Sequence, residues 1–296
     1  MQRARHMTRM LAFVAGGVIL APLACADRAA ESDDTAAALS GAPATTEFEA
    51  VGALLAGGDF FCTGSLVSPQ LVLTAKHCLR DDDVDFALGA DATRSTRRIR
   101  LLRPKGAPPE RGGINDLGSD VGVYEIAPEN AVTDVRPLPI DTHTLSAGDL
   151  GRTFTAVGYA LGIGGAAPIR RAGKLALRAV AGSPAQLAFS DRAAFSGWVV
   201  DNGAQLPGDR LSREVWDLPL LDGYEVWLGD HSSEVKICGG DSGGPLIDVA
   251  GGSAAIVGVA SWTWRAAMRG ACGFYGAAYA VFGSEARGFL TTRIAH

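Results

Sequence analysis

The sequence reads Cys-Gly-Gly-Asp-Ser-Gly-Gly-Pro from Cys238 to Pro245. Glycine has no Cβ, so the glycines on both sides of Ser242 allow the backbone to turn sharply and to approach another molecule closely. In such a turn, the N–H groups of Gly240 and Ser242 can point together at one oxygen atom. The segment therefore indicates a hydroxyl nucleophile beside donors for a developing negative charge.

A serine hydroxyl is a weak nucleophile until a base takes its proton, and the base in turn needs a group that orients it. The sequence offers His77 in the segment Leu-Thr-Ala-Lys-His-Cys, and Asp120 at the start of the segment Asp-Val-Gly-Val-Tyr. Asp116 is a rival for the acid, but the Leu-Gly-Ser that follows it is typical of a loop rather than a strand. We therefore expect His77 to act on Ser242 and Asp120 to orient His77.

These segments resemble the motifs of one family, the trypsin-like serine proteases of the chymotrypsin fold. Residues 240–245 look like its nucleophile motif, residues 73–78 like its histidine motif, and residues 120–124 like its aspartate motif. Lys76 stands where that family usually has alanine, while the order histidine, aspartate, serine agrees. The resemblance covers about residues 38–294. It implies a secreted serine endopeptidase that acts on protein or peptide substrates through an acyl-enzyme and needs no metal or organic cofactor.

The composition is that of an ordinary globular protein, with 47% hydrophobic residues and 38 glycines among 296, and it argues against disorder. From residue 50 onward, short apolar runs alternate with turn residues, a pattern typical of an all-β barrel or sandwich. The family resemblance implies two antiparallel six-stranded β-barrels, over residues 48–145 and 146–296. A short helix is expected over residues 284–295, whereas residues 181–230 give no clear assignment.

The first 26 residues have the pattern of a secretory signal peptide: three arginines, an apolar run from Met10 to Leu23, and then Ala-Cys-Ala. We therefore expect an exported protein that is extracellular, periplasmic or on the outer surface of a bacterium, with residues 27–47 as a linker or propeptide. Two alternatives remain open at the end of the signal. Either Cys25 carries a lipid that tethers the protein to a membrane, or cleavage after Ala26 removes Cys25.

Removal of residues 1–26 takes away three arginines and no acid, which moves the formal net charge from −5 to −8. A chain this acidic argues against the clustered cationic surface that nucleic-acid binding needs. The basic cluster over residues 94–100 is interpreted as a solvated edge strand. We expect no nucleic-acid partner, and we expect a monomer.

The chain has five cysteines, so one is left over if the others pair. The family resemblance implies the disulfides Cys62–Cys78 and Cys238–Cys272, which leaves Cys25 as the odd residue. The first would close the loop that carries the histidine, and the second would tie the nucleophile segment to the wall of the specificity pocket. No CxxC pair or histidine cluster accompanies these cysteines, so no metal site is expected.

The same resemblance assigns the pocket for the substrate side chain that precedes the scissile bond. Lys236, six residues before the nucleophile, falls at its floor, and its walls are assigned to Ser261, Trp262, Thr263 and Ala277. A lysine at the floor would repel basic side chains, and these walls would leave a shallow site. We therefore expect small apolar residues to be preferred and acidic residues to come second; the alternative is that Lys236 points away. The insertion over residues 263–272 is either a substrate-binding lip or a surface loop.

Members of that family usually mature by a cut before an aliphatic residue, and the new amine pairs with the aspartate that precedes the nucleophile, here Asp241. Residues 38–44 align with that start, but no arginine or lysine precedes them. We expect cleavage before Ala38 or Leu39 by another kind of protease; the alternative is that the oxyanion hole forms without this switch. A rival function is a catalytically silent, protease-like binding module, and a non-protease serine esterase is a third hypothesis.

Overall fold

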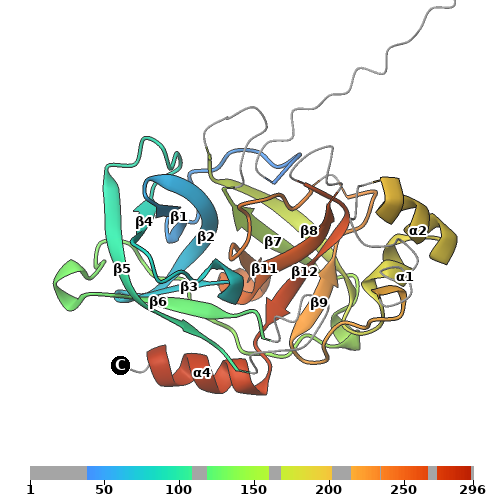
Figure 1. Ribbon diagram of the computed structural model, residues 1–296. Coiled ribbons are helices and arrows are strands. Elements are labelled where there is room, and N and C mark those ends of the chain that lie inside the picture. The colour runs from blue at the N-terminus through green and yellow to red at the C-terminus, as the bar shows by residue number, and fades with distance from the viewer. Residues whose placement is uncertain are drawn as a thin grey trace, which may run out of the picture. The chain divides into compact units, whose positions relative to one another are not determined.

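Short runs of buried residues build two closed barrels in the structure, which is a computed structural model (Figure 1). It describes residues 39–108, 119–159, 168–201, 215–233, 235–265 and 272–294. All of these belong to the second of the two units into which the chain divides, residues 34–296. The predicted fold class, two antiparallel six-stranded β-barrels with a short C-terminal helix, is confirmed.

The first barrel closes because β1 pairs with strands on both of its sides. The spatial order is β1-β2-β3-β6-β5-β4. Leu54 of β1 lies opposite Cys62 of β2 and opposite Phe86 of β4, and all three side chains are buried in one apolar core. The strands are β1 (Val51–Ala56), β2 (Asp59–Ser68), β3 (Leu71–Thr74), β4 (Val84–Leu88), β5 (Arg97–Gly106) and β6 (Gly122–Ile126).

The second barrel repeats this arrangement in the order β10-β11-β12-β9-β8-β7. It closes between β10 and β7, where Leu246 lies opposite Ala156. Leu246, Phe154 and Leu228 are among the buried side chains of its core. The strands are β7 (Thr153–Gly158), β8 (Arg171–Ala179), β9 (Glu225–Leu228), β10 (Pro245–Asp248), β11 (Ala255–Arg265) and β12 (Gly273–Val281).

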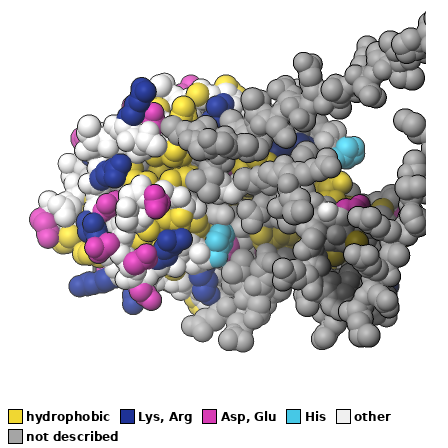
Figure 2. All heavy atoms as spheres, turned by 45° about the horizontal axis from the view of Figure 1, so that its top comes forward, with side chains coloured by type: hydrophobic (Ala, Val, Ile, Leu, Met, Phe, Trp, Pro, Cys, Tyr) yellow, Lys and Arg dark blue, Asp and Glu magenta, His cyan; other side chains and the backbone are white. Residues whose placement is uncertain are grey.

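The sequence predicts a solvated edge strand for the basic cluster over residues 94–100. Residues 97–100 belong to β5 and pair with β4, whereas the pairing of β5 with β6 begins at Leu101. β5 as a whole is therefore an inner strand of the closed barrel, with the cluster at the end where its pairing is one-sided. The exposed arginines of β5 alternate with the buried Ile99 and Leu101. Arg100 pairs with Asp83 at 2.6 Å. Figure 2 shows basic and acidic side chains intermixed over the described part of this lobe.

The described part of residues 181–230, which gave no assignment, includes the short helices α1 (Pro184–Ala188) and α2 (Arg192–Asp201) as well as β9. Both helices lie beside the second barrel (Figure 1). Asp191 caps α2, because its Oδ1 accepts a backbone N–H of the first turn at 2.9 Å. Aromatic side chains of this insertion contact Trp264 near the end of β11. The sequence did not predict these helices.

Buried side chains also join the two barrels to each other. One cluster combines Val123 of β6 with Val259 of β11, and the C-terminal helix α4 (Ser284–Ile294) adds Leu290 to it. A second cluster combines Val51 of β1 with residues of β7 and β10. These contacts fix the barrels against each other, so loops from both can form one site. Among the described residues, no helix is long and apolar enough to cross a membrane.

Candidate active site

His77 and Asp120 come together because they flank two neighbouring strands. His77 lies in a 3-10 turn, Lys76–Cys78, that follows β3, and Asp120 lies two residues before β6 begins. β3 and β6 run antiparallel with Thr74 opposite Gly122, so the end of one strand adjoins the start of the other. Main-chain register therefore brings the two side chains to one place.

The buried carboxylate of Asp120 holds His77 at two points. Its Oδ2 lies 2.8 Å from Nδ1 of His77, and its Oδ1 accepts the backbone N–H of His77 at 2.9 Å. Ser261 donates a further hydrogen bond from Oγ to Oδ2. An ionised carboxylate only accepts hydrogen bonds, so this contact favours the tautomer in which Nδ1 of His77 is the donor. The His77 side chain is 29% exposed and that of Asp120 only 1%, so the imidazole reaches the surface and the carboxylate lies buried behind it.

Ser242 and His77 line the same cleft, which has a volume of about 560 Å³. The hydrogen bonds of the described residues include those of Asp120 to His77 and Ser261, but none from Ser242 Oγ to the imidazole. Such contacts are often long in a free enzyme and tighten only when substrate binds. Two of the three residues predicted for catalysis thus line one cleft, and the third, Asp120, contacts His77 from behind.

The segment that carries Ser242 is held by Thr63, a buried residue of β2 in the other barrel. Thr63 donates its N–H to the carbonyl of Ser242 and its hydroxyl to the carbonyl of Gly240, both at 2.8 Å. Among the described residues, no acceptor takes the N–H group of Gly240 or of Ser242, and both residues line the cleft. Gly240 has a φ of +95°, which glycine adopts readily. These two N–H groups are therefore available to a ligand oxygen.

The two glycines after Ser242 have a packing role that sequence reasoning missed. A Cβ at Gly243 would lie 2.0 Å from Oγ1 of Thr74, and a Cβ at Gly244 would lie 2.3 Å from the carbonyl oxygen of Val157. Gly243 also has a φ of +78°. The glycines therefore allow the nucleophile segment to contact the strands of both barrels, in addition to any approach to a substrate.

Asp241 is buried and accepts hydrogen bonds from two backbone N–H groups. Its Oδ2 lies 2.8 Å from the N–H nitrogen of Cys238 and 3.2 Å from that of Leu39. Leu39 is itself buried, with a φ of +40° that leucine rarely adopts. The next residue, Ser40, accepts a backbone hydrogen bond from Lys236 at 2.9 Å. The first described residue thus lies against the aspartate that precedes Ser242.

The residues predicted for the pocket walls divide into two groups. Ser261, Trp262 and Thr263 line the cleft. Ala277 does not, because it lies buried on β12, where it pairs with Thr263. The hydroxyl of Thr263, on β11, donates to the carbonyl of Gly276, on β12. One wall of the cleft is therefore the outer part of β11, supported by β12.

Lys236, predicted for the pocket floor, is not among the residues that line the cleft. Its ammonium group donates to the carbonyls of Asp230 and His231, each at 2.9 Å. Burial lowers the pKa of Lys236, and the nearby charge of Asp230 opposes that shift. The charge is thus bound to a neighbouring turn.

A buried carboxylate supports Trp262, and sequence reasoning missed it. Glu225, at the start of β9, accepts Nε1–H of Trp262 at 2.9 Å and the backbone N–H of Leu221 at 2.8 Å. Burial raises the pKa of Glu225 in spite of these two bonds, and the charge of Asp120 adds to the effect. An acid at the head of the apolar run Glu-Val-Trp-Leu was the available signal.

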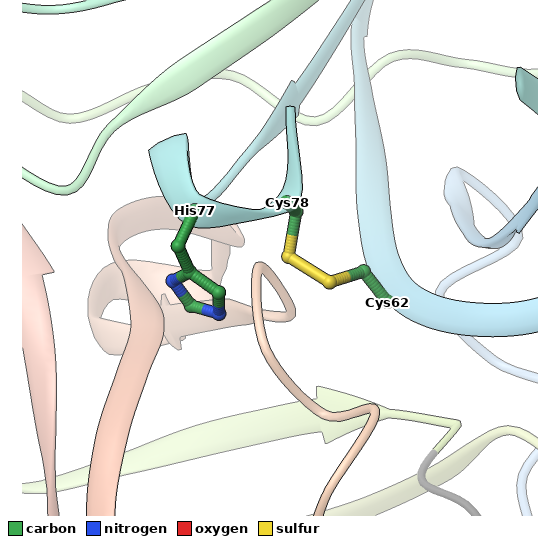
Figure 3. Close-up of side chains that lie close together, drawn as sticks. All are labelled: Cys62, His77 and Cys78. Carbon is green, nitrogen blue, oxygen red and sulfur yellow. A yellow bond between two sulfur atoms is a disulfide. The ribbon is translucent and has the colours of Figure 1, made fainter. Parts of the chain in front are cut away.

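The two predicted disulfides, Cys62–Cys78 and Cys238–Cys272, are both present. Figure 3 shows the first beside the imidazole of His77. The two sulfurs and a histidine nitrogen lie within 4.8 Å of one another. However, the sulfurs are bonded to each other, and only thiolates are effective metal ligands. This disulfide instead ties β2 to the turn that carries His77.

Several predicted features lie outside the described residues. They are Cys25, Ala38, Asp116 and residues 266–271 of the insertion after Thr263.

Comparison with known proteins agrees with this architecture. A family model described as Trypsin matches residues 39–168. Coagulation factor IX of Oryctolagus cuniculus is 24% identical over 222 residues, which cover 73% of this chain and 71% of that protein. Lectizyme of Glossina austeni is 22% identical over 228 residues, covering 72% and 71%. Together with the two closed barrels and the His77–Asp120 pair, these matches show that the chain is similar to trypsin-like serine proteases.

Proposed function

We propose that this protein is a serine endopeptidase with Ser242 as nucleophile, His77 as general base and Asp120 as the orienting acid. The observation that carries the proposal is the 2.8 Å contact between Asp120 Oδ2 and His77 Nδ1, at a cleft that Ser242 also lines. The family supports a protein or peptide as the substrate.

In the first half of the reaction, Ser242 Oγ attacks the carbonyl carbon of the scissile bond while its proton passes to Nε2 of His77. Asp120 stabilises the resulting imidazolium through Nδ1. The N–H groups of Gly240 and Ser242 donate to the oxyanion, and each such donor typically lowers the barrier by about 3–4 kcal/mol. The C–N bond then breaks, and His77 gives its proton to the leaving amine.

In the second half, water attacks the acyl-enzyme and His77 takes a proton from it. The bond from the acyl carbon to Ser242 Oγ breaks, and the proton returns to Oγ. The acid product leaves, and the enzyme is restored.

A fluorophosphonate probe tests whether the Ser242 hydroxyl is activated. We expect an intact-mass adduct on the processed protein and on Ser253→Ala, whose exposed serine lies outside the cleft. Ser242→Ala should give no adduct and no peptide cleavage. If the folded, processed wild type also gives no adduct and no peptide cleavage, the endopeptidase proposal is wrong. The rival function, a catalytically silent, protease-like binding module, then takes its place.

We propose that the enzyme matures by a cut before Ala38 or Leu39. The 3.2 Å contact of the Leu39 nitrogen with Asp241 supports a cut before Leu39, because that nitrogen would then become an ammonium group beside a buried carboxylate. The cut would also release Leu39 from its unfavourable φ, which costs about 1–3 kcal/mol. N-terminal sequencing of active enzyme tests this; a start at Cys25 or Asp27 would contradict it.

We propose that small apolar side chains are preferred before the scissile bond, with acidic ones second. Ile237 and Thr263 on the cleft wall support the apolar preference. The contacts of Lys236 with two carbonyls weigh against a strong acidic preference. A cleavage profile from a peptide library, dominated by Arg or Lys at this position, would overturn the proposal.

We propose that the protein is exported, and the two disulfides support this because such bonds persist in oxidising compartments. Tethering through a lipid on Cys25 and cleavage after Ala26 remain the two alternatives. Intact-mass measurement of protein from its natural host decides between them. A lipid-bearing start at Cys25 indicates the tether, and a start at Asp27 indicates free release.

A further inference from the structure

The cleft continues past His77 onto the first barrel. Besides His77, the lining residues from that barrel are Phe61, Cys62 and Arg80. The pocket walls at residues 237–240 and 261–263 all belong to the second barrel. If Ser242 is the nucleophile, the acyl part of a substrate lies toward those walls. The leaving amine, which His77 must protonate, then lies toward the first barrel.

Arg80 is held in place on this side. Its guanidinium carbon lies 4.0 Å from the centroid of the Phe61 ring, a cation–π contact. Its backbone N–H donates to the hydroxyl of Tyr124 at 2.7 Å, and that hydroxyl donates to the carbonyl of Cys78 at 3.1 Å. The disulfide Cys62–Cys78 links the segments that carry Phe61 and Arg80. The guanidinium is thus placed before any substrate arrives, which lowers the entropy cost of binding to it.

Arg80 lines the cleft, and no acidic residue is among the described residues that line it. Among the described lining residues, Arg80 carries the one permanent charge. Of the acids that follow it in sequence, Asp83 and Asp85 both pair with Arg100, at 2.6 and 2.8 Å. Asp81 and Asp82 are exposed and do not line the cleft. A carboxylate brought in by a substrate would therefore meet an arginine fork suited to it.

We propose that Arg80 and Phe61 form a subsite that selects substrates with Asp or Glu in the first two residues after the scissile bond. This inference rests on the proposed peptidase activity and concerns the opposite side of the scissile bond from the pocket of Ser261–Thr263. It makes the substrate class a peptide that is acidic on its leaving-group side.

Acyl transfer measures this side of the cleft separately. An ester substrate first acylates Ser242, and a dipeptide amide then competes with water for the acyl group. The amine nitrogen attacks the acyl carbon, the bond to Ser242 Oγ breaks, and the amine proton returns to Oγ through His77. The probes are dipeptide amides that carry Glu, Gln or Lys at either position. The ratio of aminolysis to hydrolysis reports only how well each probe binds on the leaving-group side.

We expect wild type to use the Glu probes about threefold to tenfold better than the Lys probes at low salt, and less so as salt screens the charges. Arg80→Gln should bring the preference for Glu over Lys probes close to one, and Arg80→Glu should invert that preference. The matched control is Arg94→Gln, which alters an 89% exposed arginine outside the cleft and should keep the wild-type ratio. Ester hydrolysis by water should be the same in Arg94→Gln as in wild type.

The outcomes separate the two proposals. If the ester acylates Ser242 but the wild-type ratio does not depend on probe charge, the subsite is refuted and the peptidase proposal stands. The same holds if the preference survives Arg80→Glu. If no acyl-enzyme forms, the peptidase proposal fails and this inference fails with it.

Discussion

The first barrel positions His77 and Asp120 through one strand pair, whereas the second builds its wall of the cleft from segments that are far apart in sequence. His77 and Asp120 meet because β3 and β6 are paired in a given register. Trp262 instead depends on Glu225 of β9 and on the ring of Trp264. Main-chain pairing thus fixes the base, while side-chain packing fixes the wall. Variants on the two sides should therefore differ in what they change.

The packing behind the wall reaches well beyond the cleft. The Trp262 ring lies 5.3 Å from Trp227 and 5.4 Å from Trp264, and Trp264 lies 5.5 Å from Phe195 of α2. Aromatic pairs of this kind contribute about 0.5–1.5 kcal/mol each beyond the area they bury. The helical insertion is therefore connected to the cleft wall by a chain of aromatic contacts. Among the described residues, no such chain surrounds His77.

Asp120→Asn tests the first barrel and should have the largest effect. The amide would donate to Nδ1 of His77, so the proton would move to Nε2 and the base would be lost; kcat should fall about 10⁴-fold. Steady-state kinetics on processed protein measures this, with circular dichroism to check the fold. Asp134→Asn, an exposed change in the same half, should leave kcat unchanged. A variant at residue 120 that keeps a tenth of the activity would refute the role of Asp120.

Gly243→Ala tests the joint between the barrels. The new Cβ would lie 2.0 Å from Thr74 Oγ1 and 2.4 Å from the carbonyl oxygen of Thr63, at a φ of +78°. We expect the free energy of unfolding to fall by about 3 kcal/mol or more. Gly252→Ala is the matched control, because its φ is +79° and nothing lies within 4 Å of its Cβ. It should cost only about 1 kcal/mol. Equal losses in urea titrations would show that the contact with the first barrel is unimportant.

Glu225→Gln tests the wall of the second barrel. Oε1 of the amide can still accept from Trp262, but its NH₂ group would face the N–H of Leu221, so one hydrogen bond is lost. Loss of this hydrogen bond should let Trp262 move in the cleft wall, which should raise KM about threefold to tenfold and leave kcat within about twofold. A fall in kcat with KM unchanged would mean that Glu225 acts on the His77–Asp120 pair instead.

The same variant should change how stability depends on pH. Burial raises the pKa of Glu225 above its ordinary 4.5. In the interval between 4.5 and the raised pKa, the folded protein binds more protons than the unfolded chain, so its stability falls as pH rises. Glu225→Gln removes this loss, so the free energy of unfolding of the variant, relative to that of wild type, should increase as pH rises from 4.5. The exposed Glu129→Gln is the matched control for the change of acid to amide. Urea denaturation at several pH values measures both differences.

Much of the first barrel's part in the site could be predicted from sequence, because each contribution is local. His77 sits beside Cys78 in a short motif, and Asp120 opens an apolar strand. The glycines around Ser242 were also recognised, but only for the turn and for close approach to a substrate. Their packing against Thr74 and Val157 could not be, since it depends on how two barrels pack against each other.

The second barrel's wall was predicted less well, because it depends on contacts over long sequence separations. Glu225 reaches Trp262 across 37 residues, and no local pattern announces that pairing. Helices α1 and α2 were also missed, and α1 is too short to show a clear period. A local sequence motif identifies which residues belong to the site. Only the packed structure identifies the residues that hold them in position.

Lys236 offers the finest test of the comparison, with the smallest expected effect. Because its ammonium binds the carbonyls of Asp230 and His231, Lys236→Met should change the ratio of kcat/KM for acidic over apolar residues before the scissile bond by less than about twofold. Thr263→Gly, on the lining wall, should instead favour larger side chains. A tenfold loss of acidic substrates in Lys236→Met would mean that the lysine turns toward substrate, so that the wall is remade on binding. The second barrel would then differ from the first in mobility as well as in the way it is built.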